Sequence, residues 1–385
     1  MRAYPAAVIL SIAAIAACSA TSTTGPTGQT SPTIQPSGSS QPQTVTVTAS
    51  VTCRDDASDA DRLQQAINSS RPGAAIGIKG GTCLLTKGIS LLGDRTYVGA
   101  SRTGTVLRQD GDMGSVLASS SYVDNAPTTG QPLAIRNLTV ECDGSGSTDG
   151  IIILNWQVDV AGVDVRNCGG SGIVDTNTTA NGRAIDNTSV NSRFENNFIS
   201  DSGRYGFEVH DSDNSVTDGY LVNNQIASSG ADAIHLENAA GWNISGNHLY
   251  SDGGDAIYAN RLYGTTIYGN HIEDFGLRQT SGTWYGIVGT AQGGMGSTIF
   301  NNTISNNKGE SAGARYIYIA VTRTNYGTGY LSVTGNIVLG VRSSDVGLSF
   351  DGGANKLSVA SSGNKVARAG TASRHDRNAT LTSGT

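Results

Sequence analysis

An asparagine followed closely by a hydrophobic residue recurs along most of this chain, and this repeat constrains the fold more than any other feature. From residue 197 onward the steps are 27, 23, 23, 32, 34 and 28 residues apart. Internal periods of about 20 to 50 residues are typical of solenoids, in which each unit buries its apolar face against its neighbours. The repeating asparagines are Asn137, Asn197, Asn224, Asn247, Asn270, Asn302, Asn336 and Asn364.

The residues between these asparagines favour short strands over helices. Leucine is sparse, which argues against leucine-rich repeats, and the chain has 51 glycines in 385 residues, which argues against helical repeats. Segments such as 266–268 and 331–333 are strand-like and are separated by Gly, Asn and Asp turns. A coil of about 23 residues with two or three short strands predicts a parallel β-helix. We expect inward Ile and Leu to stack and turn asparagines to form amide ladders.

A helix is expected ahead of the first coil. Residues 59–70 place Leu63, Ala66 and Ile67 on one helical face, and the Arg-Pro-Gly sequence at 71–73 ends the pattern. Such a helix can cover the open end of a β-helix, which otherwise exposes unpaired strand edges.

Residues 59–68 and 71–107 together resemble the cap and first coils of the pectate-lyase-like right-handed β-helix superfamily, and later repeats extend the resemblance over residues 51–368. The resemblance implies an all-β fold, a right-handed parallel β-helix solenoid with an N-terminal capping helix. It does not fix an activity, because this fold hosts lyases, hydrolases, epimerases, tailspikes and adhesins.

The first fifty residues and the last seventeen are predicted to lie outside the fold. An apolar run at 5–17, too short to span a bilayer, ends in Ile-Ala-Ala-Cys18, which resembles a bacterial lipobox. We therefore expect a lipoprotein signal peptide over 1–18 with lipidation at Cys18, a disordered Ser/Thr/Pro stalk over 19–50 and a flexible tail over 369–385. The alternative is a general secretory signal cut nearby. Either way we expect an extracytoplasmic monomer, on the outer face of a bacterial membrane or secreted.

Four further cysteines suit an exported domain. Cys53, Cys83, Cys142 and Cys168 allow three disulfide pairings, of which sequence proximity favours Cys53–Cys83 and Cys142–Cys168. None lies in a Cys-x-x-Cys pair, which argues against a cysteine zinc site. With 25 basic and 31 acidic residues, the net charge of −6 also argues against nucleic acid as a partner.

Alignment of the coils on a second recurring step, Gly or Ala followed by an apolar residue, predicts one polar face. Residues at equivalent positions of adjacent coils stack at strand spacing. Six such residues come from three adjacent coils, namely Glu208, His210, His235, Glu237, Tyr258 and Asn260, and the flanking residues include Arg204, Tyr205, Asp232, Asp255 and Arg261. Acids, bases and cations in one patch suit acid–base catalysis on a sugar. The structural alternative is that these positions are solvated and that Asp232 and Asp255 form turns.

One string within this patch resembles a family motif. Residues 205–211, Tyr-Gly-Phe-Glu-Val-His-Asp, resemble the YGFDPH[ED] motif of mannuronan C5-epimerases. The resemblance implies that Tyr205 exchanges the C5 proton, Glu208 takes the place of the motif's Asp, His210 is a second acid/base and Asp232 is the acidic residue one coil later. Val209 replaces the motif's Pro, and the family's upstream lysine has no clear match, so that Arg183, Arg193 or Arg204 would substitute for it.

We therefore expect an enzyme that abstracts the C5 proton of an acidic polysaccharide, either a lyase or a uronate C5-epimerase. The predicted catalytic residues are Tyr205, Glu208, His210, Asp232 and His235, and the predicted substrate-binding residues are Arg204, Glu237, Tyr258, Asn260 and Arg261. No cofactor is assigned, although short acidic pairs at 211–213 and 252–255 bring calcium into consideration. His248 and His271, which are 23 residues apart, are interpreted as a structural repeat.

Two alternatives stay open. The first is a β-helix glycoside hydrolase that uses two carboxylates from Glu208, Asp232, Glu237 and Asp255, whose separation would distinguish retaining from inverting chemistry. The second is a non-catalytic, lipid-anchored carbohydrate-binding or surface protein. Its sugar-stacking platforms would come from the exposed aromatic residues, for which the candidates are Trp156, Trp242, Trp284, Tyr263, Tyr316 and Tyr318.

Overall fold

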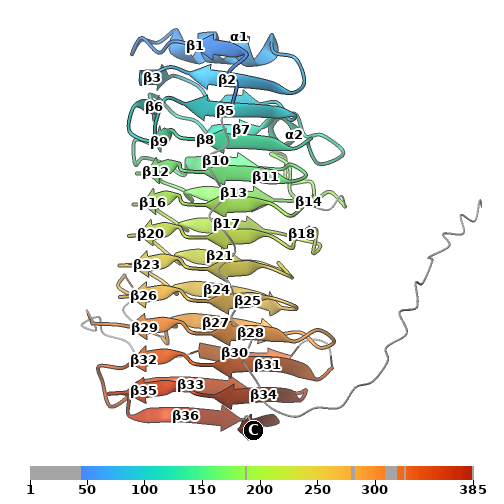
Figure 1. The fold of residues 1–385 in the computed structure, drawn as a ribbon, viewed down its shortest axis with the longest axis vertical. Helices are drawn as coiled ribbons and strands as arrows, with labels where there is room; N and C mark the ends of the chain where they lie inside the picture. Colours follow the sequence, from blue (N-terminus) through green and yellow to red (C-terminus); the bar gives the residue numbers. More distant parts are fainter. Residues whose placement is uncertain (1–44, 187–188, 279–281, 308–318, 325–326, 384–385) are drawn as a thin grey trace, which may run out of the picture. The chain divides into compact units, whose positions relative to one another are not determined.

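The computed structural model describes residues 45–186, 189–278, 282–307, 319–324 and 327–383. Over these residues the chain forms a stack of coils in which successive strands pair with the strands of the next coil, and all named pairs are parallel (Figure 1). This confirms the predicted parallel β-helix. The predictions for residues 1–44, the signal peptide, Cys18 and most of the stalk, lie outside the described residues. No helix among the described residues has the length and apolar character needed to cross a bilayer.

Three sheets run along the stack. Sheet A consists of β1 (Ala49–Val51), β2 (Ala74–Ile78), β5 (Arg95–Gly99), β8 (Leu133–Arg136), β11 (Val158–Ala161), β15 (Arg193–Glu195), β19 (Tyr220–Val222), β22 (Asn243–Ser245), β25 (Thr266–Tyr268), β28 (Ser297–Phe300), β31 (Gly329–Thr334), β34 (Leu357–Ser362) and β37 (Ala379–Ser383). Sheet B consists of β3 (Gly81–Leu85), β6 (Thr105–Gln109), β9 (Thr139–Glu141), β12 (Asp164–Arg166), β16 (Phe198–Ser200), β20 (Gln225–Ala227), β23 (His248–Tyr250), β26 (His271–Glu273), β29 (Thr303–Ser305), β32 (Ile337–Leu339) and β35 (Lys365–Ala367).

Sheet C carries the candidate site. It consists of β4 (Ile89–Leu91), β7 (Ser115–Ser119), β10 (Asp149–Ile153), β13 (Ile173–Thr176), β17 (Phe207–His210), β21 (Ile234–Leu236), β24 (Ile257–Leu262), β27 (Ile287–Ala291), β30 (Ile319–Thr324), β33 (Val346–Asp351) and β36 (Thr371–Asp376). The remaining elements are the small pair β14 (Ser189–Val190) and β18 (Val216–Thr217), and the helices α1 (Asp59–Asn68) and α2 (Ser120–Val123).

The core is built from rows of apolar side chains that repeat from coil to coil. In sheet C, Ile173, Phe207, Ile234 and Ile257 are in register on consecutive strands, and all four are fully buried. Because side chains alternate between the faces of a strand, the intervening residues of this sheet point outward. The repeat therefore fixes both the core and the outward columns.

The predicted asparagine ladder is present at the turn before sheet B. The Nδ2 of Asn224 donates to Oδ1 of Asn247 at 3.0 Å, and Asn247 donates in the same way to Asn270. Each Oδ1 also accepts the backbone N–H of the preceding ladder residue. The residue before each ladder asparagine has a positive φ, as at Asn223 and Gly246, which explains why Asn or Gly stands there. The ladder satisfies buried amides that would otherwise be unpaired.

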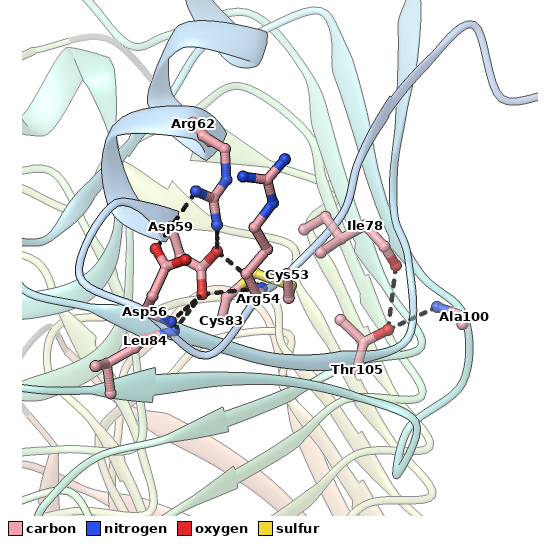
Figure 2. The surroundings of a disulfide bond; sticks show 10 residues. All are labelled: Cys53, Arg54, Asp56, Asp59, Arg62, Ile78, Cys83, Leu84, Ala100 and Thr105. Carbon is pink, nitrogen blue, oxygen red and sulfur yellow. Dashed lines mark hydrogen bonds and ion pairs between the residues drawn. A yellow bond between two sulfur atoms is a disulfide. The ribbon is translucent and has the colours of Figure 1, made fainter.

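The helix α1 covers the N-terminal end of the stack, as predicted (Figure 1). Its Asp59 is fully buried, and its carboxylate accepts the backbone N–H groups of Arg54, Asp56 and Leu84 and forms an ion pair with Arg62 (Figure 2). A buried carboxylate is stable only when its charge and hydrogen-bonding capacity are met in this way. Asp59 therefore fastens the helix to the first strands.

Two disulfides join neighbouring segments, Cys53–Cys83 near the cap (Figure 2) and Cys142–Cys168 between successive coils. This is the pairing that sequence proximity favours. Both bonds lie in the N-terminal half of the stack.

The C-terminal end differs from the expectation of a flexible tail over 369–385. Strands β36 and β37 continue the stack and pair in register with β33 and β34. The side chains of β36 are mostly polar and all are exposed, which is why their sequence favours a frayed tail. Parallel pairing uses backbone groups, which are present whatever the side chains are.

Candidate active site

The candidate site lies on the outer face of sheet C, where a column of side chains crosses the coils. The central column contains Val174, Glu208, His235, Tyr258 and Val288, which are in register on β13, β17, β21, β24 and β27. At this position of the strand, three consecutive coils carry a polar residue, and the coil on either side carries a valine. The predicted alignment of Glu208, His235 and Tyr258 is therefore confirmed.

A stack of four planar groups is the main feature of this face. The Arg204 guanidinium lies 4.6 Å from the ring centroid of Tyr205, and the Tyr205 ring is stacked on His235 at 4.1 Å. The His235 ring is in turn stacked on Tyr258 at 4.5 Å, with an interplanar angle of 12°. The imidazole is thus held between two phenol rings, which fixes its orientation.

Asp232 holds His235 and also joins two coils. Its Oδ2 lies 2.7 Å from Nδ1 of His235, while its Oδ1 accepts the backbone N–H of Asp255 at 2.8 Å. Asp255 repeats the second contact by accepting the N–H of Tyr285. Burial, and then the nearby Asp232 carboxylate, raise the pKa of Asp255 well above its usual range. Both aspartates thus link neighbouring coils through backbone N–H groups, and Asp232 in addition contacts the histidine.

Glu208 is almost completely buried although it belongs to the outward column. Its Oε2 accepts the hydroxyl of Ser171 at 2.7 Å, and its Oε1 lies 3.3 Å from Nη2 of Arg204. Arg204 itself is more than half exposed, with a side-chain exposure of 58%. Glu208 therefore anchors a guanidinium that still reaches solvent beside the stack.

Two residues that sequence reasoning missed, Asp149 and Ser171, complete this end of the site. The Oδ1 of Asp149 accepts the backbone N–H of Ser171 at 2.6 Å. Burial, and to a lesser degree the charge of Glu208, raise the pKa of Asp149 to about 6 against the opposing effects of Ser171 and Arg204. Asp149 precedes a Gly-Ile step just as Asp232 precedes an Ala-Ile step, so aligning this position would have found it.

The environment of Tyr205 keeps its hydroxyl protonated. Burial, followed by the charge of Asp232, raises the pKa of Tyr205, and Arg204 only partly opposes this. A phenol with a raised pKa stays protonated at neutral pH, so it carries a proton that it can donate and no phenolate that could act as a base. Tyr205 is therefore better suited to donate a proton than to remove one.

The remaining predicted residues lie beside the stack. His210 contacts Glu237 through Nδ1 and Oε2 at 3.0 Å, and both side chains are 45% exposed. Arg261 donates to the side-chain oxygens of Asn238 and Gln292, and Asn260 accepts the backbone N–H of Asn238. His210 and Glu237 thus form a separate acid–base pair at the edge of the site, whereas Asn260 and Arg261 belong to an amide network.

The aromatic platforms expected of a binding protein are only partly available. Trp242 is 1% exposed and packs against Phe194 and Phe207, so it cannot stack on a sugar, and its assignment to the surface is wrong. Trp156 is 40% exposed. Tyr316 and Tyr318 lie outside the described residues.

Comparison with known proteins establishes the fold class. The family model described as right-handed beta helix region matches residues 149–338. This range includes the four stacked side chains, Arg204, Tyr205, His235 and Tyr258. This match confirms the right-handed parallel β-helix. No curated protein matches the sequence.

Solved structures with the same fold differ widely in sequence. The gp42 tailspike of Acinetobacter phage vb_AbaP_AS12 has a TM-score of 0.59 at 10% identity, over 88% of this chain and 63% of the tailspike. The catalytic unit of a GH87 alpha-1,3-glucanase from Streptomyces thermodiastaticus strain HF3-3 has a TM-score of 0.51 at 14% identity, over 88% of this chain and 69% of that unit. The A-module of the mannuronan C-5 epimerase AlgE6 from Azotobacter vinelandii has a TM-score of 0.50 at 14% identity, over 86% and 96%.

Proposed function

We propose that this right-handed parallel β-helix protein is an extracytoplasmic enzyme that acts on an acidic, uronate-containing polysaccharide by removing the C5 proton. The observation that carries the proposal is the stack of Arg204, Tyr205, His235 and Tyr258, with Asp232 holding the imidazole. It combines a cation, a protonated phenol and an oriented histidine within one face. One of the similar structures is described as a mannuronan C-5 epimerase module, which agrees with this class of substrate.

Arg204 would neutralise the uronate carboxylate. A C5 proton next to a charged carboxylate is barely acidic, because its removal would place a second negative charge on the same group. A guanidinium matches a carboxylate in a bidentate manner and stabilises the enolate as charge develops. Arg204 is exposed enough to reach a glycan, and Glu208 limits the positions that it can take.

His235 would remove the C5 proton. The contact between Asp232 and Nδ1 favours the tautomer that carries its proton on Nδ1 and a lone pair on Nε2. The C5–H bond breaks, its proton passes to Nε2 and its electron pair enters the uronate enolate. In a lyase, this electron pair then forms the C4–C5 double bond, the C4–O bond breaks, and the departing oxygen takes the proton of the Tyr205 hydroxyl. In an epimerase, a proton returns from solvent to the other face of C5, because Tyr205 is stacked on His235 and approaches the sugar from the same side as the base.

A second candidate is glycoside hydrolysis, and a specific observation favours it. Asp149 and Glu208 both contact Ser171, and the pKa of Asp149 is raised to about 6. Glycosidases need one carboxylic acid that stays protonated near neutral pH and one ionised carboxylate. This pair would replace His235 and Tyr205 as the reacting groups.

Proton NMR of glycans incubated with the purified protein separates these functions. We would test alginate, polygalacturonate and hyaluronan as uronates, and an unbranched neutral glucan as the control. New alkene signals identify a lyase, and altered uronate signals without chain cleavage identify an epimerase. New reducing ends with intact C5 protons contradict proton abstraction and favour the hydrolase. No change in any glycan favours the lipid-anchored binding protein.

A further inference from the structure

A second cluster of titratable side chains lies on sheet B, away from the candidate active site. His248 begins β23 and His271 begins β26, and these two residues are in register on adjacent coils. Their imidazole rings are stacked, with centroids 4.9 Å apart and an interplanar angle of 18°. Glu273 stands two residues after His271, on the same face of the strand. The predicted repeat of the histidines is thus present, with a carboxylate beside it.

Both imidazoles direct the same nitrogen toward this one carboxylate. The Nε2 of His271 lies 2.8 Å from Oε1 of Glu273, and the Nε2 of His248 lies 3.7 Å from Oε2. One ligand atom from each of the three residues lies within 4.8 Å of the others. Among the described residues, His248 Nε2 has no hydrogen-bond partner and is shielded from solvent. A shielded nitrogen without a partner is unusual in a folded protein.

The cluster is also accessible from outside. One member of the cluster, His248, lines a polar surface hollow of about 320 Å³, whose other walls include Arg102, Phe198 and Gln225 but neither His271 nor Glu273. The three side chains of the cluster are 35% to 51% exposed. Although the Nε2 atom of His248 is shielded, rotation of these partly exposed side chains would let an ion reach it without unfolding of the coil.

We propose that His248, His271 and Glu273 bind a divalent transition-metal ion, with Zn²⁺ as the best match. Two imidazole nitrogens and one carboxylate oxygen suit Zn²⁺ and its first-row neighbours, whereas Ca²⁺ requires six to eight oxygen ligands. Three protein ligands leave the fourth tetrahedral position of Zn²⁺ for water. Small side-chain rotations would bring the two Nε2 atoms within the ligand spacing that the ion needs.

The ion would join two coils of the solenoid. His248 belongs to one coil, and His271 and Glu273 belong to the next, so binding would link neighbouring strands through side chains. A ligand that binds only the folded state stabilises it. The proposal does not depend on the glycan chemistry of sheet C.

Competition titration tests this site directly. The purified full chain is stripped of metal, and Zn²⁺ is titrated in the presence of a chromophoric chelator. We expect one ion per chain, and a loss of affinity of about tenfold or more in His271→Gln and in Glu273→Gln. His375→Gln is the matched control, because His375 lies exposed in β36 on sheet C. It should bind Zn²⁺ as the wild type does.

Thermal unfolding gives a second readout that does not rely on the chelator. Zn²⁺ should raise the unfolding temperature of the wild type and of His375→Gln, and should have little effect on His271→Gln. Because the altered side chains of His271 and Glu273 are 51% and 35% exposed, the variants should fold normally, which circular dichroism can check. Equal Zn²⁺ affinity in the wild type and both ligand variants would overturn the proposal, as would an equal loss in His375→Gln.

Discussion

Asp232 contacts the Nδ1 atom of His235 with one carboxylate oxygen, at 2.7 Å, and uses its other oxygen to accept a backbone N–H from the next coil. The same side chain therefore has a structural contact and a contact with the candidate base. This division makes the two roles experimentally separable.

Replacement of Asp232 by Asn should abolish most activity and preserve the fold. The amide oxygen can still accept the Asp255 N–H, whereas the amide NH₂ would donate to His235 and favour the wrong tautomer. Loss of the orienting carboxylate costs about 100-fold or more in kcat in comparable Asp–His pairs. Steady-state kinetics and thermal unfolding measure both effects. Asp218→Asn, at an exposed turn, is the control, and an active Asp232→Asn variant would contradict the role of this pair.

Replacement of Tyr205 by Phe should preserve the stack and remove the proton donor. The ring still lies against His235 and under Arg204, so the free energy of unfolding should change by less than about 1 kcal/mol. We expect kcat to fall by about 100-fold, which is typical of a lost general acid. A large loss of stability together with activity would instead indicate that Tyr205 serves packing alone.

The pH dependence of stability should report Asp149. Its pKa is raised from 3.8 to about 6 in the folded protein, mainly by burial, so the folded state holds this proton more tightly than the unfolded state. The stabilisation that the protonated Asp149 carboxyl contributes is fully present below about pH 4, and it is lost as the pH rises through about 6. Urea unfolding at several pH values should show this decline. In Asp149→Asn the decline should be smaller, and an unchanged slope would contradict the raised pKa.

Each buried asparagine of the ladder should raise the free energy of unfolding by at least about 2 kcal/mol. Asn247 is almost fully buried and exchanges amide hydrogen bonds with Asn224 and Asn270. Asn247→Ala leaves several buried groups unpaired, at about 1 to 3 kcal/mol each, so we expect at least about 2 kcal/mol of destabilisation. Gln225→Ala, at an exposed position of β20 in the neighbouring coil, is the control. Equal stability of the two variants would show that the ladder contributes little.

Cys18 should carry the lipid if the signal sequence is a lipoprotein signal. Expression in a bacterium with a labelled fatty acid should label the wild-type chain and leave Cys18→Ser unlabelled. Labelling of neither chain, with the wild type released to the medium, would favour the general secretory signal.

The sequence predicted the fold and the central column of the site because the repeat itself defines strand register. Once the coils are aligned, the pairing of Glu208, His235 and Tyr258 follows from the spacing of equivalent strand positions. The cap, the ladder and both disulfides depend on equally local patterns. The family model covers residues 149–338, which include the central column.

The parts that sequence reasoning missed depend on how side chains pack across coils. Nothing in the repeat shows that the Trp242 side chain points inward and packs against Phe194. Nor does the repeat show that the Tyr205 ring, which lies before β17, stacks on His235 of the next coil. The burial of Glu208 follows from its contacts with Ser171 and Arg204, which come from two different coils. The strands after residue 369 were missed because the side chains of β36 are mostly polar and exposed, and among the described side chains of β37 only Ala379 and Leu381 pack against the core.

Exchange of the C5 proton with solvent tests the central claim most directly. The wild-type protein and His235→Gln are incubated in heavy water with the uronate glycan on which the wild type acts, and deuterium at C5 of the unreacted and product sugars is measured by NMR and mass spectrometry. The account predicts that the wild type changes the C5 position, by deuterium incorporation or by loss of its proton to a double bond, and that His235→Gln does so at least about 100-fold more slowly. Cleavage by the wild type with C5 protons fully retained, or unchanged C5 chemistry in His235→Gln, would contradict it.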